Sequence, residues 1–158
     1  MPVITTSCDM TAIHRRVVAL REDRDPTFIA RLDSGWAVFG ERQFLRGYAL
    51  LLPDPVVPTL NDLAPPARAR FLDDMARLGD ALLAATEALR INYAMFGNLE
   101  PALHAHVIPR YRDELAPLDV AHPWAYDWNA APLFDPQREA TLLAAVRDAL
   151  GVSQSSFR

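Results

Sequence analysis

Two of the four histidines in this chain stand one residue apart, in the segment LHAHVIPRY that runs from Leu103 to Tyr111. Side chains alternate across an extended strand, so His104 and His106 would face the same way, about 7 Å apart along it. Neutral imidazole is a good nucleophile near pH 7, because its unperturbed pKa is about 6.5, and it is also a common metal ligand. The pair therefore indicates a nucleophilic site or a metal site, although a single strand histidine is usually structural.

The metal hypothesis needs more ligands than this pair. A zinc or iron site takes a third protein ligand and usually a fourth. The sequence does not place His14 or His122, Cys8 is the one cysteine, and the chain has no H-E-x-x-H motif. The sequence therefore gives the metal site no support but leaves it open.

Length and charge limit the kind of protein. The 158 residues fit one domain, expected over 1–152 with a flexible tail over 153–158. The formal charge of −4 argues against nucleic acid as the main partner. No apolar run approaches the roughly 18–20 residues that span a bilayer. The first residues, MPVITTSCDM, do not resemble a secretory signal. We therefore expect a cytoplasmic protein with no membrane partner.

The elements that position the histidines follow from periodicity. Apolar residues spaced by four and three, from Phe71 to Leu89, predict one long amphipathic helix over 66–89. Two β-prone runs around Asp33-Ser34-Gly35 predict a hairpin. The remaining expected elements are a weak helix at 11–20, strands at 48–53, 91–96 and 103–109, and a last helix from Asp135-Pro136 to Gly151. Strands clustered around one long helix favour an α+β fold with a mainly antiparallel sheet.

The neighbourhood of the pair is more specific than the pair itself. The segment GNLEPALHAHVIPRY resembles the signature of the histidine triad (HIT) family, and the resemblance extends over roughly residues 27–112. His104 matches the middle histidine, which is the nucleophile of that family, and His106 matches the third. Ala102 stands where the first histidine would be. Asn98 takes the place of a glutamine that contacts phosphate.

The resemblance implies a HIT-like fold of about five strands, a long helix and a C-terminal helix. It also implies a hydrolase that cleaves dinucleoside polyphosphates or nucleoside phosphoramidates at the α-phosphate, through a covalent nucleotidyl-histidine on His104. His106 and Asn98 would bind the phosphate and Asn92 would support them. Gly40 stands where relatives often carry a residue that contacts ribose. The family reaction needs no metal or cofactor, and its members pair into homodimers.

Two other functions stay open. Replacement of the first histidine by Ala102 is also compatible with a nucleotide-binding protein that has lost turnover. The histidine pair is also compatible with a metal-dependent hydrolase.

Two smaller questions stay open too. Arg110 either reaches phosphate or is a surface cation, and the aromatic segment PWAYDWN at 123–129 covers the substrate or packs against a partner subunit.

Overall fold

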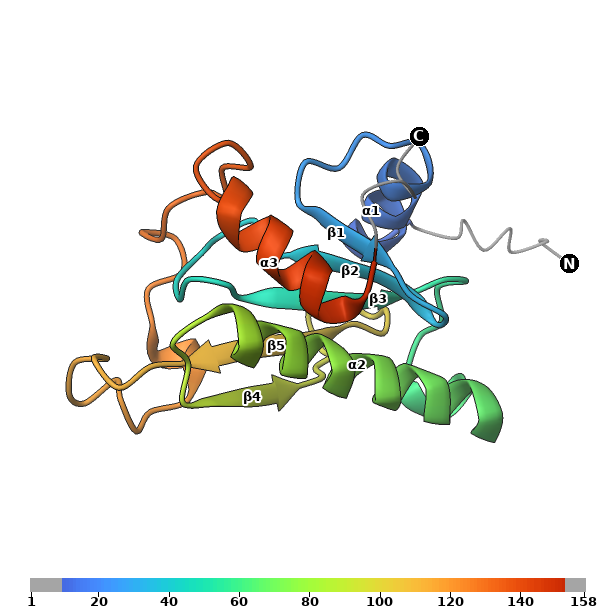
Figure 1. Cartoon of the computed structure of the whole chain (residues 1–158). Coiled ribbons are helices and arrows are strands. Elements are labelled where there is room, and N and C mark those ends of the chain that lie inside the picture. The colour runs from blue at the N-terminus through green and yellow to red at the C-terminus, as the bar shows by residue number, and fades with distance from the viewer. Residues whose placement is uncertain (1–9, 153–158) are drawn as a thin grey trace, which may run out of the picture.

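A five-stranded antiparallel sheet forms the centre of the computed structural model, which describes residues 10–152 (Figure 1). The strand order is β1-β2-β3-β5-β4. The strands are β1 (Phe28–Arg31), β2 (Gly35–Phe39), β3 (Ala49–Pro53), β4 (Arg90–Ala94) and β5 (Ala105–Arg110). In the described residues, three α-helices accompany them: α1 (Ala12–Arg21), α2 (Pro65–Ala85) and α3 (Ala140–Leu150). The predicted α+β fold is confirmed, whereas the predicted tail at 153–158 lies outside the described residues.

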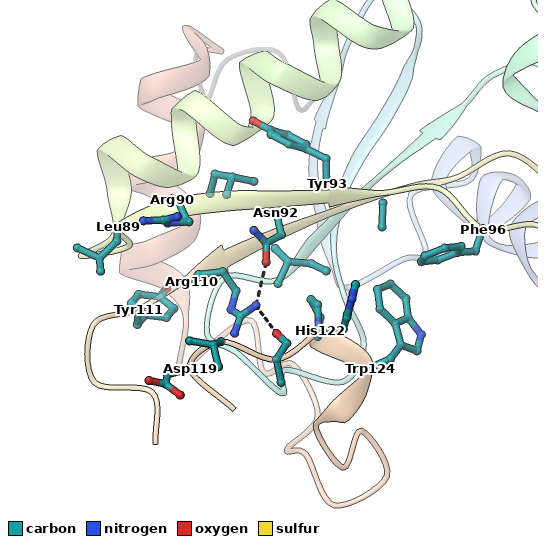
Figure 2. Close-up of a pocket in the computed structure, with 16 residues that line it drawn as sticks. Leu89, Arg90, Asn92, Tyr93, Phe96, Arg110, Tyr111, Asp119, His122 and Trp124 are labelled. Carbon is teal, nitrogen blue, oxygen red and sulfur yellow. Dashed lines mark hydrogen bonds between the residues drawn. The ribbon is translucent and has the colours of Figure 1, made fainter. Parts of the chain in front are cut away.

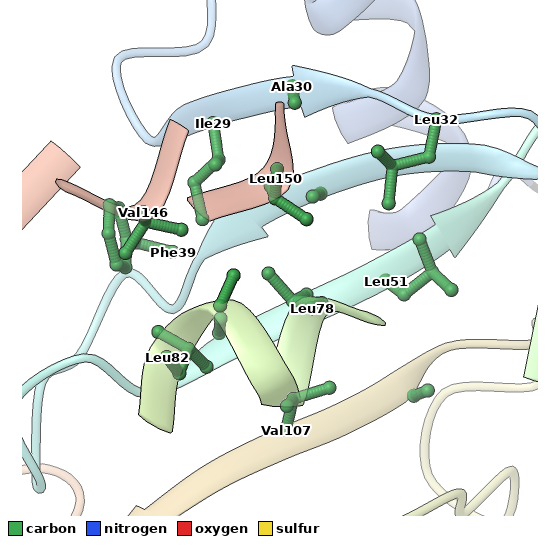
Figure 3. Close-up of a cluster of buried hydrophobic side chains, with 14 of the residues drawn as sticks. Ile29, Ala30, Leu32, Phe39, Leu51, Leu78, Leu82, Val107, Val146 and Leu150 are labelled. Atoms are coloured by element: carbon green, nitrogen blue, oxygen red, sulfur yellow. The ribbon is translucent and has the colours of Figure 1, made fainter. Parts of the chain in front are cut away.

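Helices α2 and α3 cover one face of the sheet. Figure 3 shows Leu78 and Leu82 of α2 between the strand residues Leu51 and Val107, and Val146 of α3 beside Phe39. All of these side chains are fully buried, so this layer is the main hydrophobic core. No helix within residues 10–152 has both the length and the apolar character needed to cross a bilayer.

Helix α1 lies against the opposite face, where the histidines are. Its buried residues Ile13, Val17 and Leu20 recur at spacings of four and three, so they form one apolar stripe. This stripe packs in a second cluster that includes Leu50 and Ile108 of the sheet. The side chain of Thr11 caps the helix by accepting a bond from the backbone N–H of His14. The weakly predicted helix at 11–20 is therefore real, and it borders the histidine face.

Helix α2 ends four residues before the predicted limit of 89, so that boundary was wrong. Thr86 is extended, with φ −134° and ψ 172°. Beyond it, the N–H of Leu89 donates to the carbonyl of Arg110 at 2.8 Å, which continues the pairing of β4 with β5. Leu89 fits the helical period by sequence, but the hydrogen bond to a distant strand decides its conformation.

The last helix was also predicted to begin too early, at Asp135-Pro136. A carboxylate oxygen of Asp135 accepts bonds from the N–H groups of Gln137 and Arg138. These bonds form a separate turn, because Asp side chains bond the backbone just ahead of them, and α3 begins only at Ala140. Gly151 ends the helix as predicted, in the left-handed conformation with φ +74°.

Candidate active site

Strand β5 and the residue before it present the two histidines. The predicted strand at 103–109 began too early, because the N–H of Leu103 donates to the carbonyl of Val57, in the connector between β3 and α2, rather than to a strand. His104 therefore precedes β5 and His106 lies on it. The predicted alternation is nevertheless observed: Leu103 and Ala105 face the main core, whereas the imidazoles lie on the other face with ring centroids 4.9 Å apart.

The position of the proton on His104 follows from the one hydrogen-bond partner that its ring has within residues 10–152. Its Nδ1 lies 2.7 Å from the carbonyl oxygen of Ala102. A carbonyl oxygen only accepts hydrogen bonds, so Nδ1 carries the proton. In the neutral imidazole the other nitrogen, Nε2, then holds a free lone pair. The backbone thus fixes His104 in the tautomer that a nucleophile requires.

A cavity of about 750 Å³ lies in front of both imidazoles. Its other walls include one face of α1, residues 24–27 and the segment from Gly40 to Arg42. This volume is typical of a small-molecule site. The cavity is lined by four arginines: Arg15, Arg16, Arg24 and Arg42. Two carboxylates, Asp25 and Glu41, lie among them. The cavity therefore has the size and the excess of cationic side chains that suit a small anionic ligand.

Asn98 lines a different cavity, which His104 also borders. A second cavity, of about 450 Å³, is lined by Asn98, Gly97 and His104 together with residues 58–61 of the connector. His104 thus borders both cavities. The structure therefore places Asn98 near His104, and its predicted contact with phosphate stays a prediction.

Asn92 lies apart from that region. It lines a third cavity, of about 840 Å³ along β4, which neither His104 nor His106 borders. Figure 2 shows its side chain directed at Arg110, whose guanidinium donates to the side-chain oxygen Oδ1 of Asn92 at 2.9 Å. Any support that Asn92 gives to the site would therefore act through this pair.

Arg110 matches neither of the two roles considered from the sequence. It is buried, and its guanidinium donates to the carboxylate of Glu114 and to the carbonyls of Leu118 and Ala121. These bonds attach the irregular segment after β5 to the sheet. Arg110 is therefore a structural anchor for that segment.

The aromatic segment at 123–129 covers the histidines within the same chain. The Trp124 ring meets the His106 ring edge-on, with centroids 4.9 Å apart, and it also stacks on Trp128. Trp128 lines the 750 Å³ cavity beside His106. Trp124 is 45 % exposed, so the outer side of this cover faces solvent.

His106 is held neutral by its surroundings. Burial, together with repulsion from His104, lowers the pKa of His106 to about 4. Its Nδ1 lies 2.7 Å from the hydroxyl oxygen of Tyr48. Tyr48 was missed as a site residue. The only signal was its position two residues before Leu50, which pairs with His106, and that pairing is not visible in the sequence.

The comparisons with known proteins show the fold. No family model and no curated protein matches the sequence. Among solved structures, a histidine triad protein from Bradyrhizobium japonicum has a TM-score of 0.69 at 24 % identity, over 82 % of this chain and 94 % of its own.

Two further structures have the same fold. A hypothetical histidine triad nucleotide-binding protein from Sulfolobus tokodaii has a TM-score of 0.67 at 11 % identity, over 85 % of this chain and 90 % of its own. A zinc-bound histidine triad family protein from Mycobacterium smegmatis has a TM-score of 0.60 at 22 % identity, over 84 % of this chain and 90 % of its own. The chain therefore has a histidine triad fold (Figure 1).

Proposed function

We propose that this chain, which has the histidine triad fold, is a nucleotide hydrolase that acts at the α-phosphate through a covalent intermediate on His104. The observation that carries the proposal is the bond from His104 Nδ1 to the Ala102 carbonyl. It leaves the Nε2 lone pair of a buried but cavity-lining imidazole free to attack. Dinucleoside polyphosphates and nucleoside phosphoramidates are the leading substrate classes.

The reaction has two displacements. His104 Nε2 attacks the α-phosphorus, so a P–N bond forms while the bond from phosphorus to the leaving group breaks. Water then attacks the same phosphorus, the P–N bond breaks, and a nucleoside monophosphate leaves. Splitting one displacement into two is the general advantage of covalent catalysis. Asn98 and His106 would donate hydrogen bonds to the phosphate oxygens, and they stabilise charge in the transition state.

The decisive experiment compares the wild type with His104→Ala on a panel of adenosine and guanosine dinucleoside polyphosphates and phosphoramidates. We expect the wild type to release nucleoside monophosphate, and rapid quenching to trap a nucleotidyl adduct that mass spectrometry maps to His104. His104→Ala should lose turnover but still bind nucleotide. The matched control is His122→Ala, which removes an exposed histidine outside the site and should keep full activity.

The two alternatives give different results in the same assay. A nucleotide-binding protein without turnover would bind the panel in calorimetry and release no monophosphate from any member. A metal-dependent hydrolase would lose activity in EDTA and regain it with zinc. The zinc-bound structural neighbour keeps that alternative in the test, whereas the described residues contain no group of three or more His, Cys, Asp or Glu side chains that could hold a metal.

The resemblance also leads us to propose a homodimer with a continuous sheet. Strand β4 is at one end of the sheet. Two apolar side chains just before and just after it, Leu89 and Phe96, are about half exposed. An exposed apolar rim on an open strand edge is a typical subunit contact. Light scattering at micromolar concentration should give twice the mass of one chain, and a single-chain mass would contradict the dimer.

A further inference from the structure

We propose that Tyr48 is a positioning residue that fixes His106 in the tautomer with the proton on Nε2, so that His106 donates a hydrogen bond into the 750 Å³ cavity. The inference rests on the proposed function for its catalytic meaning, but its structural content can be tested without any substrate. It makes the two histidines complementary. Nε2 of His104 has a free lone pair, and Nε2 of His106 carries a proton that it can donate.

The hydrogen bond between Tyr48 and His106 is buried. The hydroxyl oxygen and Nδ1 are 2.7 Å apart, and the two rings are nearly parallel, with an interplanar angle of 13°. Tyr48 is 4 % exposed and His106 is 8 % exposed. Water therefore has little access to either group, and each must find its partner within the protein.

The direction of the bond follows from what the two atoms can do. A phenol can donate or accept, and the same is true of Nδ1, depending on the tautomer. His106 Nδ1 is the one hydrogen-bond partner that the described residues provide for the Tyr48 hydroxyl. If Nδ1 carried the proton, the buried phenolic proton would have no acceptor, which is costly. Tyr48 therefore donates, Nδ1 accepts, and the His106 proton lies on Nε2.

The protonation states agree with this direction. Burial raises the pKa of the Tyr48 hydroxyl well above its ordinary value, so the hydroxyl keeps its proton at neutral pH. The pKa of His106 is lowered to about 4, so the ring is neutral and has only one proton to place. A neutral ring with an occupied Nδ1 presents N–H at Nε2.

The surrounding residues hold the Tyr48 ring in place. Phe44 and Trp128 pack on it with ring centroids 5.0 and 5.1 Å away. The side-chain amide of Gln43 donates to the carbonyls of both Gly40 and Tyr48, at 2.8 and 2.9 Å. Several independent contacts thus aim the hydroxyl at His106, as preorganised hydrogen-bond partners of catalytic imidazoles are aimed.

The test has a spectroscopic readout that needs no activity. Long-range ¹H–¹⁵N correlation spectra of the uniformly labelled wild type report which nitrogen of each imidazole carries the proton. We expect Nε2–H for His106 and Nδ1–H for His104 at pH 7. An Nδ1–H signal for His106 would overturn the proposal, whatever the substrate assays give.

Variants then test the cause. Tyr48→Phe removes one oxygen atom, and we expect His106 to give a mixture of tautomers while His104 is unchanged. Tyr93→Phe is the matched control, because it removes the same atom on the other face of the sheet, beside Gly79. An unchanged His106 spectrum in folded Tyr48→Phe would overturn the proposal.

The catalytic consequence is measured separately on a substrate that the wild type turns over. Loss of a partner that orients a catalytic imidazole typically costs about 10- to 100-fold in activity. We expect Tyr48→Phe to lower kcat by this factor with little change in KM, and Tyr93→Phe to change neither. A panel on which the wild type is inactive contradicts the proposed hydrolase but leaves the tautomer measurement decisive. An active Tyr48→Phe with normal kcat overturns the positioning role alone.

Discussion

Gly40 lies directly against the ring of Tyr48, so closely that a Cβ at position 40 would be 2.2 Å from two ring carbons. Glycine is therefore required here for space. A residue with a side chain at position 40 cannot coexist with this tyrosine in its present position. The glycine at position 40 and the tyrosine at position 48 therefore depend on each other.

Gly40→Ala should therefore destabilise the protein and displace Tyr48. Forcing one methyl group into a packed site costs about 1–3 kcal/mol, and urea denaturation measures this loss. In a Tyr48→Ala background, the same substitution should cost much less, because the two positions are in contact. Gly97→Ala is the control, since its Cβ would meet the nearest atom at 4.0 Å. Equal costs of Gly40→Ala in both backgrounds would contradict the coupling.

The pKa of His106 makes stability depend on pH. Its folded value of about 4 lies below the ordinary 6.5, so between these two values the unfolded chain binds a proton that the folded chain refuses. The contribution of His106 to the free energy of unfolding is fully present above pH 6.5. It falls by up to about 3 kcal/mol as the pH is lowered toward 4.

Urea unfolding at several pH values between 7 and 4 measures this effect as a difference between proteins. His106→Asn should show a shallower loss of stability on acidification than the wild type, because the refused proton is gone. His122→Asn, which changes an exposed histidine, should keep the slope of the wild type. Parallel curves for the wild type and His106→Asn would show that His106 does not titrate differently on folding.

The sequence predicted those parts of the fold that depend on short-range patterns. The alternation correctly placed His104 and His106 on one face, and the punctuation at Gly35 and Gly151 correctly marked a hairpin and a helix end. These features are local, because each depends on a few neighbouring residues. The strand order was not predicted, because it depends on pairing between strands that are distant in the chain.

Two of the errors have a common physical origin. Leu89 left the helix for a hydrogen bond to Arg110, twenty-one residues later in the chain, and Tyr48 became a site residue through His106, fifty-eight residues away. Such long-range pairs override local propensity and leave no trace in a single sequence. The roles of Asn98 and Asn92 stay predictions, although Asn98 now has a place beside His104.

Asp74 should be a main contributor to stability on the core side of the sheet. It is 2 % exposed, and its carboxylate accepts from the backbone N–H and the hydroxyl of Ser34, at 2.9 and 2.7 Å, and from Arg77. Asp74→Ala leaves the Ser34 donors without a partner, which costs about 1–3 kcal/mol. Asp73→Ala, at the exposed neighbouring position, should cost less than about 0.5 kcal/mol in the same urea experiment. Equal losses would contradict the role of this bond network.

The ion pair of Arg110 with Glu114 should control the irregular segment that carries the aromatic cover. The two side chains are 10 % and 3 % exposed, and Glu114 also accepts from the hydroxyl of Tyr126. Arg110→Met leaves a buried carboxylate unpaired, which costs about 3–5 kcal/mol. Hydrogen exchange should accelerate over residues 111–126 more than in α2.

A double-mutant cycle separates the pair from its packing. Replacing both partners, as in Arg110→Met with Glu114→Met, should restore part of the stability lost in Arg110→Met, because no unpaired charge is left in the interior. Arg90→Met is the matched control, since Arg90 faces Arg110 in the β4–β5 register but is exposed. It should leave both stability and exchange close to the wild type. If the double variant were as unstable as the sum of the two single variants, the two side chains would act independently and the anchor would have to lie elsewhere in the segment.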